Sequence, residues 1–523
     1  MMISLRRFFT ALAALLLAAL PGVGVADPGD IAAASRGVVR VVLIQYDGGS
    51  ARLVSHGTGF AIAPDLVVTN AHVVEDLRGS DGIVAGVVPS EGRGGFAATI
   101  AAYSPQRDLA LLKLKQGAAL NALTLFSGAS TDGEEVYAVG YPGNVDMAEG
   151  LSMGDLVSPQ EAVKTRGYVS AGRSSRAFDT ILHTAPIGSG NSGGPLLDAC
   201  GRVLGVNSFG TVSENTTDSA FYFAISTREL SAFLQEAGVS PHASGAPCTS
   251  LADLERADAA RGAEDKARLA AAAEARKAAQ ADLATRAQHD AELQILVERD
   301  NGLALAAVLL VAAVAAGAAA FAFNQRCKRR ELKFAGGAAG VLALAAVGVW
   351  LLRPPLSLID ERAKDIIAEN KAKAEASPSA DASASVPEGP QKLVCVLDPQ
   401  RSRVTVSDIT DVPLTWAPGG CVNGKTQYGL AGDGWSRVLV PQGEATVSIT
   451  RFDPDRREYT VERYLMGLDA MTALREARTK LKAPACGVDE ATARALGEAQ
   501  GSIRALLPAE PNERLRYNCK PAP

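Results

Sequence analysis

The sequence lacks the patterns that mark several large classes of protein. Basic residues do not exceed acidic ones, since 52 Lys and Arg stand against 57 Asp and Glu and the formal net charge is −5. Because the basic residues are also not gathered on one folded face, nothing indicates a nucleic-acid partner. No Cys/His spacing is typical of a zinc site and no phosphate loop is present, so neither a metal nor a cofactor is expected.

Cysteine is scarce as well, with seven residues in 523. The simplest arithmetic is six paired cysteines in an oxidising compartment and one reduced cysteine, Cys327, in the cytoplasm. A bridge between Cys200 and Cys248 would close a long loop and stabilise the folded state by about 4 kcal/mol in the chain-entropy model. The six cysteines expected in disulfides are Cys200, Cys248, Cys395, Cys421, Cys486 and Cys519.

The chain begins with the pattern of a secretory signal peptide, residues 1–26. Arg6 and Arg7 precede an apolar run, and Gly24-Val25-Ala26 is an acceptable cleavage site. An uncleaved N-terminal anchor is the alternative. In either case, the segment that follows is exported.

A chain of 523 residues is too long for one core, so two or three folded units are expected. Residues 30–248 contain two sets of about six short runs rich in valine and isoleucine, separated by Gly, Pro, Asp and Asn, and they end in a predicted helix over 226–238. This pattern favours an all-β domain, with two β-barrels packed together and a cleft between them.

The middle of the chain predicts a membrane hairpin. Residues 249–300 are rich in alanine and in alternating charges, which favours a solvated helical stalk, with a disordered linker as the alternative. Residues 302–323 and 334–352 are apolar runs of transmembrane length. The loop between them, 324–333, has five basic residues and one acidic residue, so we expect it in the cytoplasm.

This topology puts the folded units on both sides of the hairpin outside the cytoplasm. If the second apolar run were buried without crossing, the last domain would be cytoplasmic, but its four cysteines argue against that. Residues 353–390 form a linker, with a short amphipathic helix expected over 358–374.

Residues 391–523 predict a small, disulfide-containing α+β domain. Its segment 415–435 resembles a MORN β-repeat, with glycine and aromatic residues spaced through hairpins. A binding or sensing module and a stabilising cap both remain open for this domain. Strands are expected around 393–398, 402–408, 435–441, 445–452 and 458–465, and helices over 468–482 and 490–507.

The stretch with the clearest chemistry is Gly190-Asn191-Ser192-Gly193-Gly194. The glycines allow a tight turn and a close approach of a substrate to the backbone. Such a turn can aim the N–H groups of Gly190 and Ser192 at one point, where the oxyanion of a tetrahedral intermediate would lie. The stretch therefore predicts a serine nucleophile.

Two upstream segments supply the partners that a serine nucleophile needs. His72, in LVVTNAHVV, follows a predicted strand and can exchange a proton near neutral pH. Asp108, at the head of the leucine-rich strand DLALLKL, can orient the imidazole and stabilise the imidazolium. Asp65 and Asp76 are the rival carboxylates.

The segments TNAHVV, RDLALLKL, GNSGGPL, GVNS and FAI, in this order, resemble the trypsin-like serine proteases, and most of all their bacterial high-temperature-requirement branch. The resemblance covers about residues 38–238 and implies a chymotrypsin-type double β-barrel with endopeptidase activity. Carried over, His72 is the base, Asp108 orients it and Ser192 is the nucleophile. The N–H groups of Gly190 and Ser192 form the oxyanion hole.

Substrate-binding positions also follow from the resemblance. It implies that Thr184, Pro186 and the strand edge Ser208, Phe209 and Gly210 contact the peptide. Two features depart from the family, because no PDZ domain follows the protease and Pro186 occupies the place of the trypsin aspartate. Preference for arginine or lysine is therefore not expected. His183 has either a structural role or lines the specificity pocket.

Together these patterns predict a membrane-anchored, extracytoplasmic serine endopeptidase that acts in envelope quality control or regulated proteolysis. We expect it in the bacterial inner membrane, with polypeptide substrates, the lipid bilayer as a partner and possible oligomerisation through the stalk and the membrane helices. A catalytically idle protease fold that binds envelope partners through the C-terminal module is the alternative. A transmembrane signalling protein ranks last, because the basic loop is short.

Overall fold

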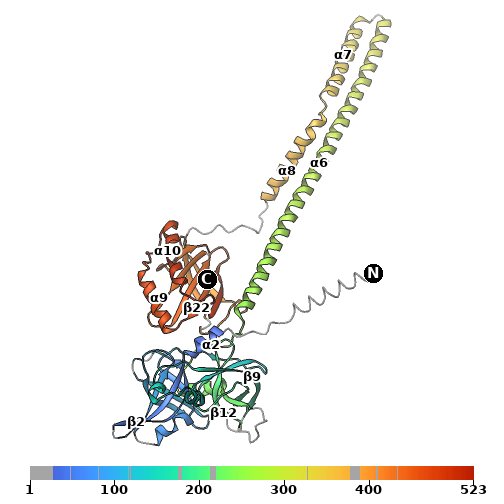
Figure 1. Cartoon of the computed structure of the whole chain (residues 1–523). Coiled ribbons are helices and arrows are strands. Elements are labelled where there is room, and N and C mark those ends of the chain that lie inside the picture. The colour runs from blue at the N-terminus through green and yellow to red at the C-terminus, as the bar shows by residue number, and fades with distance from the viewer. Residues whose placement is uncertain are drawn as a thin grey trace, which may run out of the picture. The chain divides into compact units, whose positions relative to one another are not determined.

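The computed structural model describes residues 28–47, 49–79, 82–115, 117, 119–174, 179–211, 220–326, 328–376, 389–407, 410–432 and 434–522. The expected signal peptide and Cys327 lie outside these residues. The chain divides into two compact units, Met1–Asp258 with Pro387–Pro523 and Ala259–Val386. Each unit is described by itself below (Figure 1).

The first unit opens with a helix and a closed six-stranded barrel, in the order β1-β2-β3-β6-β5-β4. Valines dominate the strands, and Val39, Val41, Val67 and Val87 fill the barrel interior. Closure pairs every strand on both sides and leaves no open edge. The elements are α2 (Pro28–Ser35), β1 (Val38–Asp47), β2 (Ser50–Ala63), β3 (Leu66–Thr69), the 3₁₀ helix η1 (His72–Arg78), β4 (Ile83–Pro89), β5 (Phe96–Ser104) and β6 (Leu109–Leu114).

A second barrel follows, because the pairing of β11 with β12 closes six strands of the next sheet into a ring, with β7 and β14 added at its side. The double β-barrel expected from the sequence is therefore present. Its elements are β7 (Leu125–Phe126), β8 (Glu135–Gly140), α3 (Gly143–Glu149), α4 (Met153–Leu156), β9 (Val163–Ser174), β10 (Asp179–His183), β11 (Pro195–Leu197), β12 (Val203–Gly210), β13 (Tyr222–Ser226), α5 (Thr227–Glu236) and β14 (Ala243–Ser244).

The two barrels pack through strands that are buried on both faces. Along β6, Ala110 and Leu112 point into the first barrel, whereas Leu109 and Leu111 belong to a separate cluster that also contains Val139 of the second barrel. Successive side chains of a strand point to opposite faces, so a strand between two cores must be apolar throughout. This explains the leucine-rich run after Asp108.

The Cys200–Cys248 disulfide expected from the sequence joins the turn between β11 and β12 to the segment after β14, 48 positions further along the chain. Beside it, Asp198 and Arg202 form a buried ion pair with 2.7 Å between Oδ2 and Nη2. The Arg202 side chain also donates to the Ala246 carbonyl, close to the second cysteine. The segment after α5 is thus attached to the barrel by both a covalent and a polar link.

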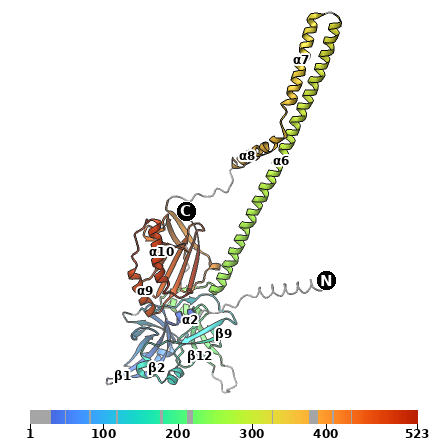
Figure 2. The same ribbon diagram turned by 45° about the horizontal axis from the view of Figure 1, so that its top comes forward.

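The second unit contains most of α6 (Leu251–Gln325), then α7 (Arg329–Leu351), η2 (Leu356–Leu358) and α8 (Ile359–Ala376). Both α6 and α7 are long and apolar enough to cross a membrane. In Figures 1 and 2, they lie side by side. The alanine-rich stretch is helical rather than irregular and continues into the first apolar run. Within the predicted basic loop, 324–333, α6 ends at Gln325 and α7 begins at Arg329.

The C-terminal domain is one nine-stranded sheet, in the order β18-β17-β16-β15-β23-β22-β21-β20-β19, with two helices. Both α9 and α10 lie along the sheet (Figure 2). Its elements are β15 (Gln391–Leu397), η3 (Pro399–Arg401), β16 (Val412–Ala417), β17 (Cys421–Val422), β18 (Thr426–Gln427), β19 (Gly429–Ala431), β20 (Gly434–Leu439), β21 (Thr446–Asp453), β22 (Glu458–Leu465), α9 (Leu468–Lys480), α10 (Glu490–Arg504) and β23 (Glu513–Pro521).

The prediction of a strand around 402–408 is wrong. Among the described residues of this segment, 402–407, the single bridge joins Arg403 to Arg514. The N–H groups of Thr405, Val406 and Ser407 instead donate to the buried Glu513 carboxylate, at 2.9, 3.1 and 3.0 Å. The Glu513 carboxylate therefore accepts the hydrogen bonds that the carbonyl groups of a neighbouring strand would otherwise accept.

The last strand, β23, was missed, although its alternation is visible in the sequence. Leu515, Tyr517 and Cys519 are buried, and polar residues stand between them. In this strand, Cys519 lies directly opposite Cys395 of β15, and the two form a disulfide. A second disulfide in the domain joins Cys421 to Cys486.

Candidate active site

His72 is the first residue of η1, directly after the turn that ends β3. The next two side chains, Val73 and Val74, are buried in the first barrel and anchor the short helix. The His72 side chain itself remains 48% exposed. The apolar neighbours thus fix the backbone, while the imidazole stays accessible to solvent.

Asp108 faces His72 from the turn between β5 and β6. The His72 ring Nδ1 lies 2.9 Å from Asp108 Oδ1 and 3.0 Å from Oδ2, and the His72 N–H donates to Oδ1 at 3.1 Å. Ser208 Oγ donates to Oδ2 at 2.6 Å. Burial opposes ionisation of Asp108, but the hydrogen bonds from His72 and Ser208 outweigh it and hold the pKa of the carboxyl below its usual value.

The backbone at Asp108 is unusual, because its φ of 53° lies in the left-handed region. A non-glycine residue costs free energy there, and such residues concentrate at functional sites. The Asn70 amide holds this backbone by donating to the Asp108 carbonyl at 2.9 Å. Of the rival carboxylates, Asp65 pairs with Lys113 and Asp76 is exposed.

The nucleophile loop is fixed by Thr58 of β2. The Thr58 N–H donates to the Ser192 carbonyl at 2.9 Å, and Thr58 Oγ1 donates to the Gly190 carbonyl at 2.6 Å. Gly190 and Gly193 have φ of 100° and 88°, values that side chains rarely adopt. A Cβ at Gly193 would also collide with the Thr58 carbonyl. The glycines around Ser192 are therefore required by the turn itself.

Ser208 joins the two halves of the candidate site. While its hydroxyl donates to Asp108, its carbonyl accepts the Ser192 hydroxyl at 2.9 Å. Ser208 of β12 thus contacts both the candidate nucleophile and the carboxylate of the His72–Asp108 pair. Within the described residues, no hydrogen bond joins Ser192 to His72, so the Ser192 hydroxyl must turn away from Ser208 to meet the base.

The N–H groups of Gly190 and Ser192 have no hydrogen-bond partner among the described residues. Unpaired donors on a rigid turn are what stabilisation of an oxyanion requires. The neighbouring N–H groups are in use, since that of Gly193 donates to the Asn207 carbonyl at 2.8 Å and that of Gly194 to the Asn191 carbonyl at 3.0 Å. The loop therefore leaves free the two donors expected from the sequence.

A charged cluster behind the nucleophile loop was missed in the sequence. Asp146 of α3 pairs with Arg40 through two contacts of 2.9 Å and lies 3.3 Å from His56 Nε2. Nearby, the Gly143 N–H donates to the Ser189 carbonyl at 2.8 Å. Burial and the Arg40 charge lower the pKa of His56, against the opposing effect of Asp146. Local spacing gives no signal for this cluster, since its members are far apart in the chain.

The residues expected to contact the substrate belong to the segment after β10 and to the end of β12. Thr184 accepts the Tyr168 N–H at 2.9 Å, and Pro186 is exposed. Phe209 is 45% exposed on β12 and stacks on Phe223, with 4.8 Å between the ring centroids. Its neighbour Gly210 pairs with Tyr222 of β13. In the described part of the chain, no group of three or more His, Cys, Asp and Glu residues could hold a metal.

His183, at the end of β10, is fully buried, which favours its structural role over a place on the pocket surface. Burial lowers the pKa of His183 to about 4.

We expect this burial to make stability depend on pH. As the pH falls below about 6.5, the unfolded chain protonates its His183 while the folded chain does not, so the free energy of unfolding falls until pH reaches about 4. The full effect is about 3 kcal/mol.

His183→Leu should lose less stability than the parent between pH 7.5 and 5, as measured by urea-dependent pulse proteolysis in a Ser192→Ala background. His289→Leu, on the exposed stalk, should behave like the parent. An equal pH dependence in His183→Leu would contradict the assignment.

Comparison with known proteins agrees with this geometry. Residues 57–206 match the trypsin-like peptidase domain. The chain is 35% identical over 185 residues to the mitochondrial serine protease HTRA2 of Bos taurus, covering 35% of this chain and 36% of the relative. It is 33% identical over 202 residues to the serine protease Rv3671c of Mycobacterium tuberculosis, covering 38% and 46%.

A third relative is the magnetosome formation protease MamE of Paramagnetospirillum magneticum, with 32% identity over 197 residues, or 35% of this chain and 24% of the relative. The chain thus spans less than half the length of each of these relatives. The residues that match the peptidase domain, 57–206, lie within the double barrel.

Proposed function

Because the chain contains a trypsin-like peptidase domain, with serine protease relatives of the high-temperature-requirement family, we propose that it is a serine endopeptidase. His72 is the general base, Asp108 orients it and Ser192 is the nucleophile. The observation that carries this assignment is the convergence on Ser208, whose hydroxyl contacts Asp108 and whose carbonyl contacts Ser192.

The reaction proceeds in two acyl-transfer steps. The Ser192 hydroxyl turns from the Ser208 carbonyl to His72 and gives up its proton as Oγ attacks the scissile carbonyl carbon. The N–H groups of Gly190 and Ser192 bind the resulting oxyanion. His72 returns the proton to the leaving amine, the C–N bond breaks and an acyl-enzyme forms. Water, deprotonated by His72, then hydrolyses the ester and regenerates Ser192.

Asp108 remains ionised during this cycle, because its pKa lies below the usual range. Its charge fixes the His72 tautomer and stabilises the imidazolium that forms in each step. Thr184, Pro186 and the edge of β12 from Ser208 to Gly210 bind the polypeptide substrate, whose backbone adds a strand to that edge.

The enzyme is anchored in the bacterial inner membrane by α6 and α7 and acts in envelope quality control or regulated proteolysis. The length and composition of the two helices, the basic residues between them and the three disulfides support this orientation, with both folded domains facing the periplasm. The stalk and the membrane helices also offer a route to oligomers.

Labelling with a fluorophosphonate tests the proposed chemistry. The reagent reacts with an activated serine, so the folded, disulfide-intact protein should carry one adduct, found by mass spectrometry on the peptide that contains Ser192. Labelling should disappear after heat denaturation. If the folded protein takes no label, the chain is instead a catalytically idle scaffold that binds envelope partners through its C-terminal domain.

A further inference from the structure

An ion pair buried inside the first unit joins α2, which precedes the first barrel, to the C-terminal domain. Asp30 of α2 and Arg403 of the C-terminal domain form a salt bridge, and each side chain is only 2% exposed. Asn512 Nδ2 donates to the other Asp30 oxygen at 2.8 Å. The two residues belong to different domains, so this contact exists only while the domains stay together. Removing either member of a buried pair leaves the other charge without a partner, which is strongly destabilising.

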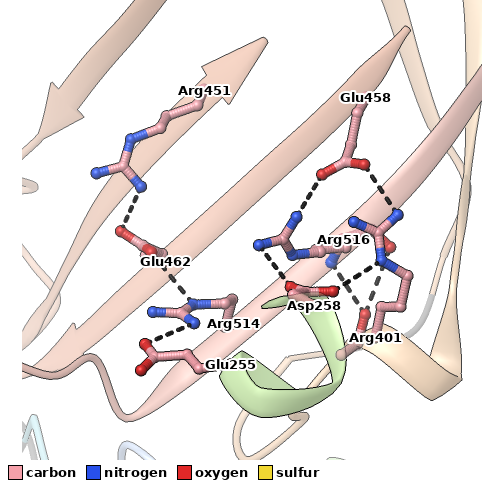
Figure 3. Close-up of polar contacts among 9 residues, drawn as sticks. Glu255, Asp258, Arg401, Arg451, Glu458, Glu462, Arg514 and Arg516 are labelled. Carbon is pink, nitrogen blue, oxygen red and sulfur yellow. Dashed lines mark hydrogen bonds and ion pairs between the residues drawn. The ribbon is translucent and has the colours of Figure 1, made fainter. Parts of the chain in front are cut away.

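A second charged contact lies where the chain leaves the first unit (Figure 3). Glu255 and Asp258, in the first turns of α6, face arginines of the C-terminal domain. Arg514 Nη1 lies 3.2 Å from Glu255, Arg516 Nη2 lies 2.9 Å from Asp258, and Arg401 Nε lies 3.3 Å from Asp258. The acids belong to the segment that follows the double barrel, whereas Arg514 and Arg516 lie in β23 and Arg401 ends η3 of the C-terminal domain.

Acidic side chains of the sheet hold these arginines in position (Figure 3). Glu458 lies 2.9 Å from Arg401 and 2.6 Å from Arg516. Glu462 lies 3.2 Å from Arg514 and 2.7 Å from Arg451. Isolated surface pairs contribute little, but pre-positioned, half-buried charges in one network lose less side-chain entropy when their partner docks.

Two backbone contacts extend the interface. Glu91, after β4 of the first barrel, accepts the Leu468 N–H at 2.9 Å, at the N-terminus of α9. A carboxylate is favourable there because the first N–H groups of a helix have no partner within it. Arg36, after α2, donates to the Leu465 carbonyl at the end of β22.

These contacts matter because the hairpin is inserted in the chain between the protease domain and the C-terminal domain, which the contacts join. The chain leaves the first unit at Asp258 and re-enters it at Pro387. We propose that the C-terminal domain is a clasp, which binds the protease domain through Asp30, Glu255 and Asp258 and thereby gives it a second, non-covalent attachment to the membrane hairpin. A cut in either connector alone then leaves the protease domain tethered.

The docking is tested in detergent, where no membrane is needed. The full chain, with Ser192→Ala and a site-specific protease sequence inserted within 379–386, is cut, and the two pieces are separated by size-exclusion chromatography under non-reducing conditions. We expect them to elute together. Glu255→Arg with Asp258→Arg should weaken the association at least about tenfold, since close charge pairs across an interface couple this strongly. Separation of the unmutated pieces would overturn the proposal.

Both substitutions lie in α6, outside the barrels and the sheet, so each domain keeps its fold. Arg456→Ala, at an exposed arginine whose ion pair joins it to Asp453 three residues away, is the matched control and should leave the pieces together. Adding Arg514→Glu and Arg516→Glu to the double variant should restore co-elution in part. A double variant that co-elutes as tightly as the parent would contradict the role of these charges.

The second attachment is tested in spheroplasts, and this arm rests on the proposed membrane anchoring. A cleavage sequence is inserted within 265–285 of the stalk, and the site-specific protease is added from outside. After this single cut, the protease domain should stay with the membrane pellet, whereas Glu255→Arg with Asp258→Arg should release it. Cutting both connectors of the unmutated protein should release the two domains as one complex.

The outcomes separate the two proposals. Release of the protease domain by the stalk cut alone would overturn the clasp and leave the anchoring intact. Retention after cuts in both connectors would overturn anchoring by the hairpin, while the result in detergent would still decide the clasp.

Discussion

Replacement of Ser192 by alanine is expected to lower the rate of peptide-bond hydrolysis about 10⁶-fold, because no other group can form the acyl-enzyme. The loss should appear in kcat, since the Ser192 hydroxyl contributes little to binding of the substrate before the attack. Hydrolysis of an unfolded protein substrate, measured with the purified full chain, checks the rate. The same samples should show no adduct with a fluorophosphonate.

The structure predicts that this variant folds. Thr58 holds the loop through the Ser192 carbonyl and the Gly190 carbonyl, and neither contact uses the Ser192 side chain. Ser50→Ala, in the exposed β1–β2 hairpin, is the matched control and should hydrolyse the substrate at the parent rate. A Ser192→Ala protein that keeps more than about a hundredth of the parent activity would require another nucleophile or a contaminating protease.

The second large effect is expected for Asp108→Asn, which should lower kcat about 10⁴-fold at neutral pH. The carboxylate accepts from His72 Nδ1, whereas an amide that donates with its NH₂ group would stabilise the wrong tautomer. The lowered pKa of Asp108 also has a consequence for the parent enzyme. The carboxyl stays ionised at pH values where an ordinary aspartate already takes up a proton, so protonation of Asp108 does not limit activity at mildly acidic pH.

The rival carboxylates provide the control for this prediction. Asp65→Asn removes a partner of Lys113, and Asp76→Asn changes an exposed residue of η1. Both should keep kcat within about twofold of the parent, as is usual for surface substitutions. If Asp108→Asn retained the parent rate while Asp65→Asn or Asp76→Asn lost it, the assignment of the orienting carboxylate would be wrong. Steady-state rates from pH 5 to 9 measure all three.

The candidate catalytic residues could be named from the sequence because each has a local signature. Ser192 stands among glycines whose positive φ the turn requires, and His72 follows a strand within an apolar segment. Asp108 precedes a strand that is apolar on both faces, since it lies between two cores. The cysteine count and the two apolar runs likewise depend only on composition and length.

Ser208 shows where local reasoning stops. Its place on the substrate-binding edge was predicted, but its hydroxyl contact with Asp108, 100 residues away, was not. The contacts of Thr58 with the nucleophile loop, and of Asp146 with His56 and Arg40, were not predicted either. None of these residues stands in a pattern that distinguishes it from other threonines, serines or aspartates.

The sequence by itself thus determined the double barrel, the candidate catalytic residues and the apolar helices, because glycine turns, strand alternation and hydrophobic length act over a few neighbouring residues. Only the tertiary structure decided which distant polar groups meet. Asp30 and Arg403 are 373 residues apart, and Glu513 replaces a neighbouring strand for residues 405–407. The physical reason is that a buried charge must find a partner, and folding rather than chain order decides which partner lies within reach.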